Sequence, residues 1–194
     1  MASITYYYFD FNDTRKQDCR GLVSSLITQL CTRRSHHSYD ILSSFYEAHE
    51  NGWRQPSEVD LIRCLKNVLE ISGQGRLYII VDAMDECAVN ECTNNPGIPS
   101  PSPRENVLRL IKELVDLRHP DIRVCITSRP EGDIRMVFGP LASHAVSLHD
   151  QAGQRGDIIN YVKSVVESDA NMRRWTRGDR QLVINTLTQN PNGM

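Results

Sequence analysis

Three carboxylates stand close together near the middle of the sequence. Asp82, Asp85 and Glu86 belong to the run IIVDAMDE and follow the short apolar segment 77–81. Like charges this close repel one another unless a cation or hydrogen-bond donors offset them. Mg²⁺ suits such a place because it takes hard oxygen ligands, one or two from the protein and the rest from water and phosphate. The run therefore predicts a magnesium site, and the alternative is a solvated acidic turn that ends a strand.

A second polar group follows the next apolar segment of the chain and consists of Thr127, Ser128 and Arg129. An arginine at a strand tip can bind phosphate oxygens through its planar guanidinium group, and the two hydroxyls can add contacts. The alternative is a salt bridge from Arg129 to Asp85 or Glu86. The two interpretations are compatible, because both place the arginine beside the carboxylates.

The surrounding residues alternate between strand and helix patterns. Apolar runs rich in aromatic or β-branched residues predict strands at 3–11, 77–81, 122–127 and 145–148, the first of them buried on both faces. Apolar residues at helical spacing predict helices at 17–33, 39–50, 57–72, 105–118, 132–139, 157–167 and 179–189. This alternation indicates an α/β fold with a parallel sheet, in which ligands bind beyond the carboxyl ends of the strands. Both polar groups follow predicted strands, so we expect them to face one crevice.

Composition and charge exclude several classes of protein. The 194 residues carry 22 Lys and Arg against 24 Asp and Glu, a formal net charge of −2 that argues against a nucleic-acid binder. No apolar run approaches the ~20 residues of a membrane helix, and the N-terminus lacks the basic segment of a signal peptide. The six cysteines are therefore expected to be reduced thiols of a cytoplasmic protein. Zinc at Cys87 and Cys92 is the minor alternative, since no second pair of ligands follows.

The two polar groups and the opening strand together resemble a known family. The run LYIIVDAMDE, residues 77–86, resembles the Walker B strand of NACHT-type NTPases. These are signal-transduction ATPases with numerous domains, of the P-loop class that has an additional strand before Walker B. The run TSRP, residues 127–130, resembles the sensor segment on the following strand. The opening YYYFDFND resembles the strand after the P-loop helix in fungal proteins with a nephrocystin-like N-terminal region, which is often joined to ankyrin or WD repeats.

The resemblance implies a role for each polar residue at the two strand tips. Asp82 would hold Mg²⁺, and one of the paired acids Asp85 and Glu86 would polarise the attacking water. Arg129 would sense the γ-phosphate of ATP or GTP, and its two neighbours Thr127 and Ser128 would contact the nucleotide. Family members act as nucleotide-controlled switches. The implied partners are flanking effector and repeat domains and further copies of the parent protein, with no nucleic acid and no membrane.

One motif of the family is missing from the sequence. The phosphate-binding loop GxxxxGK[ST] does not occur, and the dipeptide Gly-Lys is found nowhere in the chain. That loop supplies the backbone N–H groups and the lysine that hold the β and γ phosphates, so we expect poor nucleotide binding without it. The family pattern places the loop just before Ser3, and its strand next to the sensor strand. We therefore expect a gap in the sheet, or direct pairing of 145–148 with 122–127, and a marginally stable chain.

The predicted fold is thus a three-layer parallel sheet of the P-loop NTPase type, incomplete because the P-loop strand is missing. The predicted regions are a partial NACHT core at 3–150 that contains a proline-rich loop insertion at 88–103, and the start of a helical region at 151–194. The predicted function is a fragment of a nucleotide-dependent signalling switch that is not active by itself. The alternatives are a non-catalytic interaction module derived from a NACHT domain, and a metal-dependent phosphodiesterase that uses Asp10 with the three acids.

Overall fold

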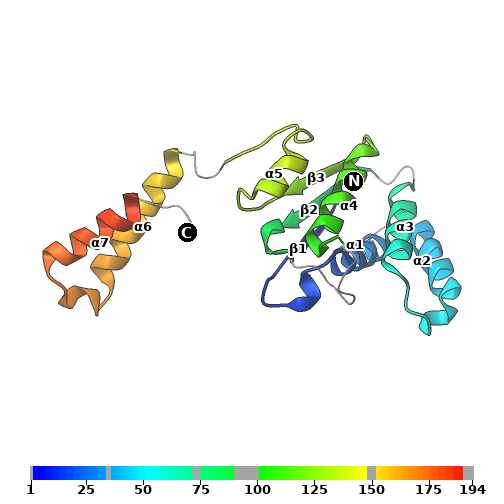
Figure 1. Ribbon diagram of the computed structural model, residues 1–194, viewed down its shortest axis with the longest axis horizontal. Helices are drawn as coiled ribbons and strands as arrows, with labels where there is room; N and C mark the ends of the chain where they lie inside the picture. Colours follow the sequence, from blue (N-terminus) through cyan, green and yellow to red (C-terminus); the bar gives the residue numbers. More distant parts are fainter. Residues whose placement is uncertain (1, 34–35, 72–74, 90–100, 148–151, 190–194) are drawn as a thin grey trace. The chain divides into compact units, whose positions relative to one another are not determined.

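The computed structural model describes residues 2–33, 36–71, 75–89, 101–147 and 152–189. The chain divides into two compact units, Met1–Ala142 and Ser143–Met194, and each is described by itself. The first unit contains a parallel sheet, and the second contains a pair of helices (Figure 1). No helix in the described ranges is both long enough and apolar enough to cross a membrane.

The sheet of the first unit has three strands, which lie side by side in the order β1-β2-β3. Their bounds are β1 (Ser3–Tyr8), β2 (Leu77–Asp82) and β3 (Ile122–Ile126). Both pairings are parallel, and the register places Tyr6 opposite Ile80 and Ile80 opposite Cys125. The α/β class, the parallel sheet and three of the four predicted strands are therefore confirmed.

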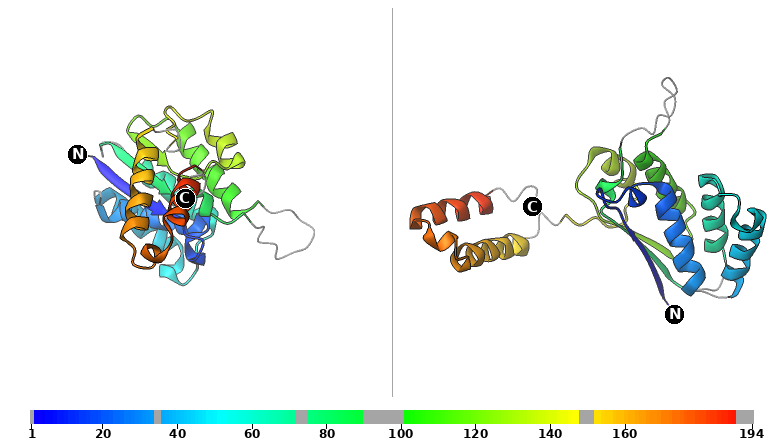
Figure 2. Two further views of the ribbon diagram at one scale, coloured as in Figure 1. Left: turned by 90° about the vertical axis from the view of Figure 1, so that its left-hand side faces the viewer. Right: turned by 90° about the horizontal axis from the view of Figure 1, so that it is seen from below.

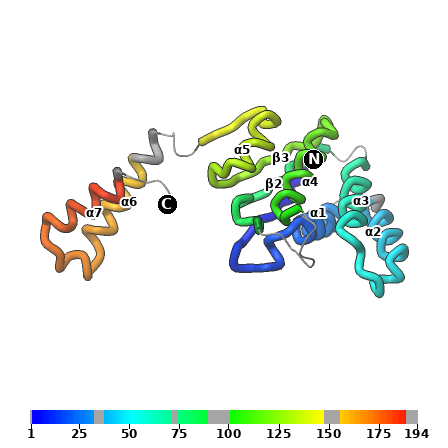
Figure 3. Tube along the Cα trace, in the orientation of Figure 1, coloured from blue at the N-terminus to red at the C-terminus, as the bar shows by residue number. Residues whose placement is uncertain are grey.

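Helices connect the strands, as the spacing of apolar residues predicts, and their path can be followed in Figure 3. The α-helices of the first unit are α1 (Cys19–Arg33), α2 (His36–Ala48), α3 (Glu58–Leu69), α4 (Pro103–Asp116) and α5 (Gly132–Phe138). Those of the second unit are α6 (Ala152–Ser168) and α7 (Arg177–Gln189), which pack on each other through Val162, Val166 and Ile184. The seven helices of the described ranges match the seven predicted ones, with ends that differ by a few residues.

Two helices of the first unit begin with the same local device. Ser57 accepts a hydrogen bond from the N–H of Asp60 at 3.2 Å, and the Asp60 carboxylate accepts one from the N–H of Ser57 at 3.2 Å. This is a capping box, and Ser102 and Glu105 form a second one before α4. Pro103 was predicted to lie in a loop, but it is the first residue of α4. At this position the backbone N–H would have no partner within the helix, so proline is tolerated. Most of the predicted loop insertion, 90–100, lies outside the described residues.

One face of the sheet forms the main core. Tyr7, Phe9, Ile79 and Val81 are buried there together with residues of α1, α3 and α4. Figure 2 shows α1 and α3 on the same side of the sheet in its right-hand view. Burial in β1 alternates from residue to residue, so the prediction of a first strand buried on both faces is wrong.

The opposite face of the sheet is exposed. Ile4, Tyr6 and Tyr8 are about half exposed, at 51 %, 52 % and 46 %, and Tyr78 of β2 is 37 % exposed. Within the first unit the arrangement is therefore a sheet with one layer of helices, in place of the predicted three layers. The physical reason is that α1 contacts both α3 and α4, so the connections lie on a single face.

The fourth predicted strand, 145–148, is absent as far as the structure describes it. Residues 145–147 have no strand conformation and are exposed, and Leu148 lies outside the described residues. A strand this short forms only when a neighbouring strand completes its hydrogen bonds, and its apolar side chain Val146 is 73 % exposed instead of packed. The expected direct pairing of 145–148 with 122–127 is therefore not formed by the described residues 145–147.

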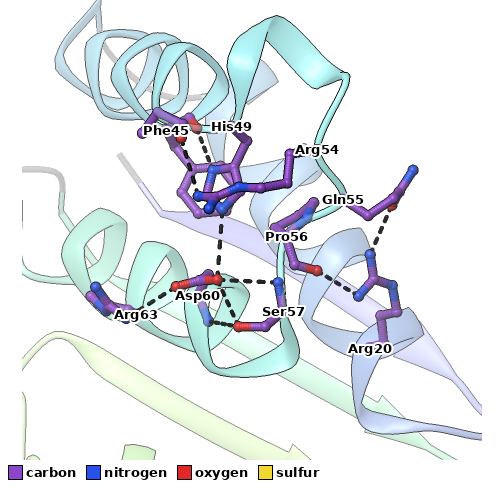
Figure 4. A network of polar contacts seen from close by, with 10 residues as sticks. Arg20, Phe45, His49, Arg54, Gln55, Pro56, Ser57, Asp60 and Arg63 are labelled. Atoms are coloured by element: carbon purple, nitrogen blue, oxygen red, sulfur yellow. Dashed lines mark hydrogen bonds and ion pairs between the residues drawn. The ribbon is translucent and has the colours of Figure 1, made fainter.

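Polar contacts join α2 to α3 and α1 to the loop before α3 (Figure 4). His49 is buried, and its Nδ1 lies at hydrogen-bond distance, 2.8 Å, from the Phe45 carbonyl. Its Nε2 lies 3.6 Å from Asp60 Oδ2, within ion-pair distance. Arg20 of α1 donates to the Pro56 carbonyl at 2.8 Å. The capping acid Asp60 therefore also links two helices.

Removing core volume from α3 tests this packing. Leu65 is fully buried, so Leu65→Ala should lower the free energy of unfolding by about 2–5 kcal/mol through lost burial and the cavity left behind. Val59 lies on the same helix and is 66 % exposed, so Val59→Ala should change it by less than about 0.5 kcal/mol. Urea unfolding followed by circular dichroism measures both, and equal effects would contradict the assigned burial.

The capping box of α3 gives a pH dependence. Hydrogen bonds from the Ser57 hydroxyl and then its N–H hold the pKa of Asp60 below its ordinary value of 3.8. A carboxylate with a lowered pKa stabilises the fold above its unfolded pKa, and this contribution is lost as pH falls through the folded pKa. The stability difference between the native chain and Asp60→Asn should therefore shrink as the pH falls below 3.8.

Urea unfolding across the acid range measures this difference. Ser57→Ala removes the main donor to the carboxylate and should weaken the same pH dependence. A difference that grows as the solution becomes more acidic would contradict the assignment.

Candidate functional site

The tips of β2 and β3 are joined by hydrogen bonds centred on Thr127. Its hydroxyl donates to Asp82 Oδ1 and accepts from the N–H of Ala83 at 3.1 Å. Its carbonyl accepts from the N–H of Met84 at 3.0 Å. The structure therefore brings Asp82 and Thr127 together, and it leaves the exposed Asp82 side chain at the carboxyl edge of the sheet.

A tight turn after β2 directs the other two acids. Ala83 has left-handed backbone angles, φ 53° and ψ 47°, and a single 3₁₀ turn, η3 (Met84–Glu86), follows. Met84 is fully buried and anchors this turn in the core, as a large apolar side chain can. The side chains of Asp85 and Glu86 consequently point in different directions and bond different residues.

Asp85 is paired with Arg129. The N–H of Arg129 donates to Asp85 Oδ1 at 2.9 Å, and its Nε lies 3.4 Å from Asp85 Oδ2. The Asp85 side chain is only 9 % exposed, whereas that of Arg129 is 76 % exposed. The salt bridge considered from the sequence is thus present, and it holds Nε of an arginine whose side chain is otherwise largely exposed.

Glu86 connects the site to the loop after β1. Its Oε2 accepts a hydrogen bond from the N–H of Phe11 at 3.2 Å. Asp10, in contrast, accepts from the N–H of Asn12 at 2.9 Å within its own turn. The Ser128 hydroxyl donates to the carbonyl of Arg129 at 2.8 Å, so it serves the local backbone.

The acids do not form a ready-made cluster for a metal. In the described ranges no group of three or more His, Cys, Asp or Glu side chains could hold an ion. The phosphodiesterase alternative requires such a group from Asp10 and the three acids, so the geometry does not support it. A magnesium site with one protein carboxylate needs only Asp82 and is compatible with this arrangement.

Arg104 belongs to this site although no pattern in the sequence singled it out. Its side chain is 5 % exposed, and Nε donates to the Cys87 carbonyl at 3.1 Å while an Nη donates to the Asp85 carbonyl. The other Nη lies 3.2 Å from Glu131 and 3.4 Å from Asp133, at the start of α5. Arg104 therefore joins the turn after β2 to the segment after β3. Its local signal in the sequence is its place two residues after Ser102, the capping residue of α4.

Cys87 is a buried structural thiol. Its Sγ donates to the Gln17 carbonyl at 3.1 Å, and burial raises the pKa of the thiol to about 12. A thiol with such a pKa is neither a nucleophile nor a ready metal ligand near neutral pH. Cys92, the other half of the zinc alternative, lies outside the described residues.

The comparisons with known proteins agree with part of the resemblance. Residues 1–129 match the family model described as "Nephrocystin 3, N-terminal", which covers the sheet and both strand tips. The chain therefore belongs to the nephrocystin 3 N-terminal family. Searches of curated proteins and of solved structures each gave no match.

Replacing Arg104 tests its structural role. Arg104→Met should lower the free energy of unfolding by about 2–4 kcal/mol, because it leaves the Asp85 and Cys87 carbonyls without donors. Arg109 on the same helix is exposed and donates to Asn106 one turn away at 2.8 Å, so Arg109→Met is the matched control. Denaturant unfolding measures both variants, and equal losses would contradict the assignment.

Proposed function

We propose that this chain is the acidic and sensor half of a nucleotide-dependent switch of the NACHT type. The observation that carries the proposal is the hydrogen-bonded link between the tips of β2 and β3, from Asp82 to Thr127 and from Asp85 to Arg129. Through this link, a change in the ligands of Asp82 would shift the position of Arg129, which follows the next strand. A switch needs such a connection between the metal-binding acid and the phosphate sensor.

The side chains are suited to distinct roles. Asp82 is exposed and has one oxygen engaged by Thr127, so the other oxygen is free to bind Mg²⁺ or its water shell. Asp85 is buried against Arg129 and serves to position it. Glu86 is the acid of the pair that is not bonded to Arg129, so we assign to it the polarisation of water. Arg129 presents its guanidinium to the γ-phosphate of ATP or GTP.

The sequence lacks the groups that bind most strongly to the β and γ phosphates. It contains no GxxxxGK[ST] loop, and the backbone N–H groups and lysine of that loop provide most of the hold on the β and γ phosphates. We therefore propose that this chain binds Mg²⁺–nucleotide weakly and does not hydrolyse it alone. Effector and repeat domains and further copies of the parent protein are the proposed partners.

The second candidate is a non-catalytic interaction module. The observation that favours it is the exposed face of the sheet, on which Ile4, Tyr6 and Tyr8 are each about half exposed. Aromatic side chains of this kind supply large contact areas at protein interfaces. Under this alternative, the tip contacts would hold the fold together and bind no nucleotide.

Nucleotide titrations separate the two candidates. We expect a fluorescent ATP or GTP analogue to bind weakly with Mg²⁺, and Asp82→Asn to weaken this binding about tenfold by removing the metal-binding charge. Asp116→Asn, at the far end of α4, is the control and should bind like the native chain. Equal signals from the native chain and Asp82→Asn would contradict the switch and favour the interaction module.

A further inference from the structure

Thr176 lies in the second unit, directly before α7. Its hydroxyl donates to Asp179 Oδ2 at 2.7 Å and accepts from the N–H of Asp179 at 3.2 Å. Its carbonyl accepts from the N–H of Arg180 at 3.1 Å, which is the first bond of the helix. Thr176 is therefore the N-cap of α7, and it is an exposed residue.

Positive charge surrounds this threonine in the sequence. Four arginines stand within four residues of it, whereas Asp179 is the single acid among residues 172–180. The arginines are Arg173, Arg174, Arg177 and Arg180. Nε of Arg180 is shielded from solvent and has no hydrogen-bond partner in the part of the chain that the structure describes. The segment thus has an excess of positive charge and an unused donor, which an anionic group at Thr176 would offset.

The order of these residues is typical of a protein kinase substrate. Arg173 and Arg174 stand three and two positions before Thr176, and Arg177 directly follows it. No other Ser or Thr in the sequence has arginine at both of the preceding positions. Kinases select their substrates partly by charge, and an acidic substrate groove favours an acceptor that is flanked by arginines. The pattern therefore indicates a kinase of this type.

The backbone before Thr176 is suited to entering such a groove. Trp175 has extended backbone angles, φ −77° and ψ 154°. The two preceding arginines belong to a single 3₁₀ turn, η5 (Met172–Arg174), which contains no buried residue. A short turn with exposed backbone bonds opens at a low cost in free energy. The segment can therefore extend locally while the body of α7 stays formed.

We propose that Thr176 is a phosphorylation site for a protein kinase with an acidic substrate groove. The γ-phosphoryl group of ATP passes to Oγ1 of Thr176, so that the bond from the γ-phosphorus to ADP breaks and a bond to Oγ1 forms. ADP leaves, and the hydroxyl proton passes through the catalytic base of the kinase to solvent. The phosphate adds about −1.5 to −2 charges and three acceptor oxygens at the start of α7.

The phosphate exchanges one set of cap contacts for another. The hydrogen bond from the hydroxyl to the Asp179 carboxylate is lost, because its proton is gone. A phosphate oxygen takes over the N–H of Asp179, which the hydroxyl now accepts. Arg180 stands four residues after Thr176, on the same side of the helix, so its guanidinium group can pair with the phosphate. Phosphorylation thereby gives the start of α7 a charged anchor.

Treatment of the full chain with a purified kinase tests the site. The probe is the catalytic domain of protein kinase C with Mg²⁺–ATP, which takes acceptors with arginine on both sides. Mass spectrometry should locate a phosphate on Thr176 of the native chain and on the serine of Thr176→Ser. Thr176→Asn keeps a capping side chain but has no hydroxyl, so this position should stay unmodified. A native chain in which Thr176 stays unmodified would overturn the proposal.

Replacing the preceding arginines tests how the site is recognised. Arg173→Gln combined with Arg174→Gln should lower kcat/KM for phosphorylation of Thr176 at least about tenfold, because the kinase loses two charge contacts. Lys163→Gln removes an exposed charge from α6 and is the control that should leave kcat/KM unchanged. Circular dichroism checks that each variant is folded. Equal kcat/KM values for the native chain and the folded double variant would overturn the proposal.

The titration of the phosphate itself tests its contact with Arg180. The second pKa of a phosphothreonine is ordinarily about 6. Neighbouring guanidinium groups favour the dianion and outweigh the single opposing carboxylate of Asp179, so ³¹P NMR of the phosphorylated chain should give a lower pKa. Arg180→Gln should raise this pKa, and Lys163→Gln should not change it. A pKa that is the same in the native chain and in folded Arg180→Gln would overturn the contact.

This proposal concerns the second unit alone and goes beyond the proposed nucleotide switch. The switch is tested by Asp82→Asn in a nucleotide titration, whereas phosphorylation is read at Thr176 by mass spectrometry. An unmodified Thr176 would therefore leave the switch untouched, and a chain that binds no nucleotide would leave the phosphorylation site untouched.

Discussion

The structure depends on the parallel pairing of β2 with a strand on each side. Parallel strands share a direction, so the residues that follow them meet at one edge of the sheet. A shift of β2 by one residue would exchange the buried Ile79 and Val81 for Tyr78 and Ile80, which lie on the exposed face, so burial fixes the register. The contact of Asp82 with Thr127 is a consequence of that register.

Arg104 connects the sheet to the helices around it. A buried guanidinium is stable only when its donors are satisfied, and four groups from two separate segments satisfy it. The turn after β2 and the beginning of α5 are thereby fixed to the first turn of α4, and the capping by Ser102 positions that turn. The geometry of Asp85 and Arg129 thus also depends on a buried residue to which the proposed function gives no contact with the ligand.

Local patterns predicted the elements well where a short-range rule decides them. The apolar stripe and the Ser57–Asp60 capping box define α3 within a few residues, because both act within one or two turns of helix. The predicted burial of β1 was wrong, because a run of aromatic residues suggested burial on both faces and the structure buries only one. Tyrosine side chains can be packed or solvated, and which occurs depends on where the helices lie. The strand expected at 145–148 failed for a related reason, since strands depend on neighbours distant in sequence.

The sequence by itself determined the α/β class, the two strand tips that carry the polar residues, and the resemblance to a nephrocystin-like N-terminal region, which the family match over residues 1–129 confirms. Only the tertiary structure decided that Asp85 pairs with Arg129, that Arg104 joins the two tips, and that Gln29 covers the edge of β1. The physical reason is the distance along the chain between the interacting residues. Side-chain types and spacing fix local conformation, but the partners of a buried charge or of a strand edge come from distant segments that only packing brings together.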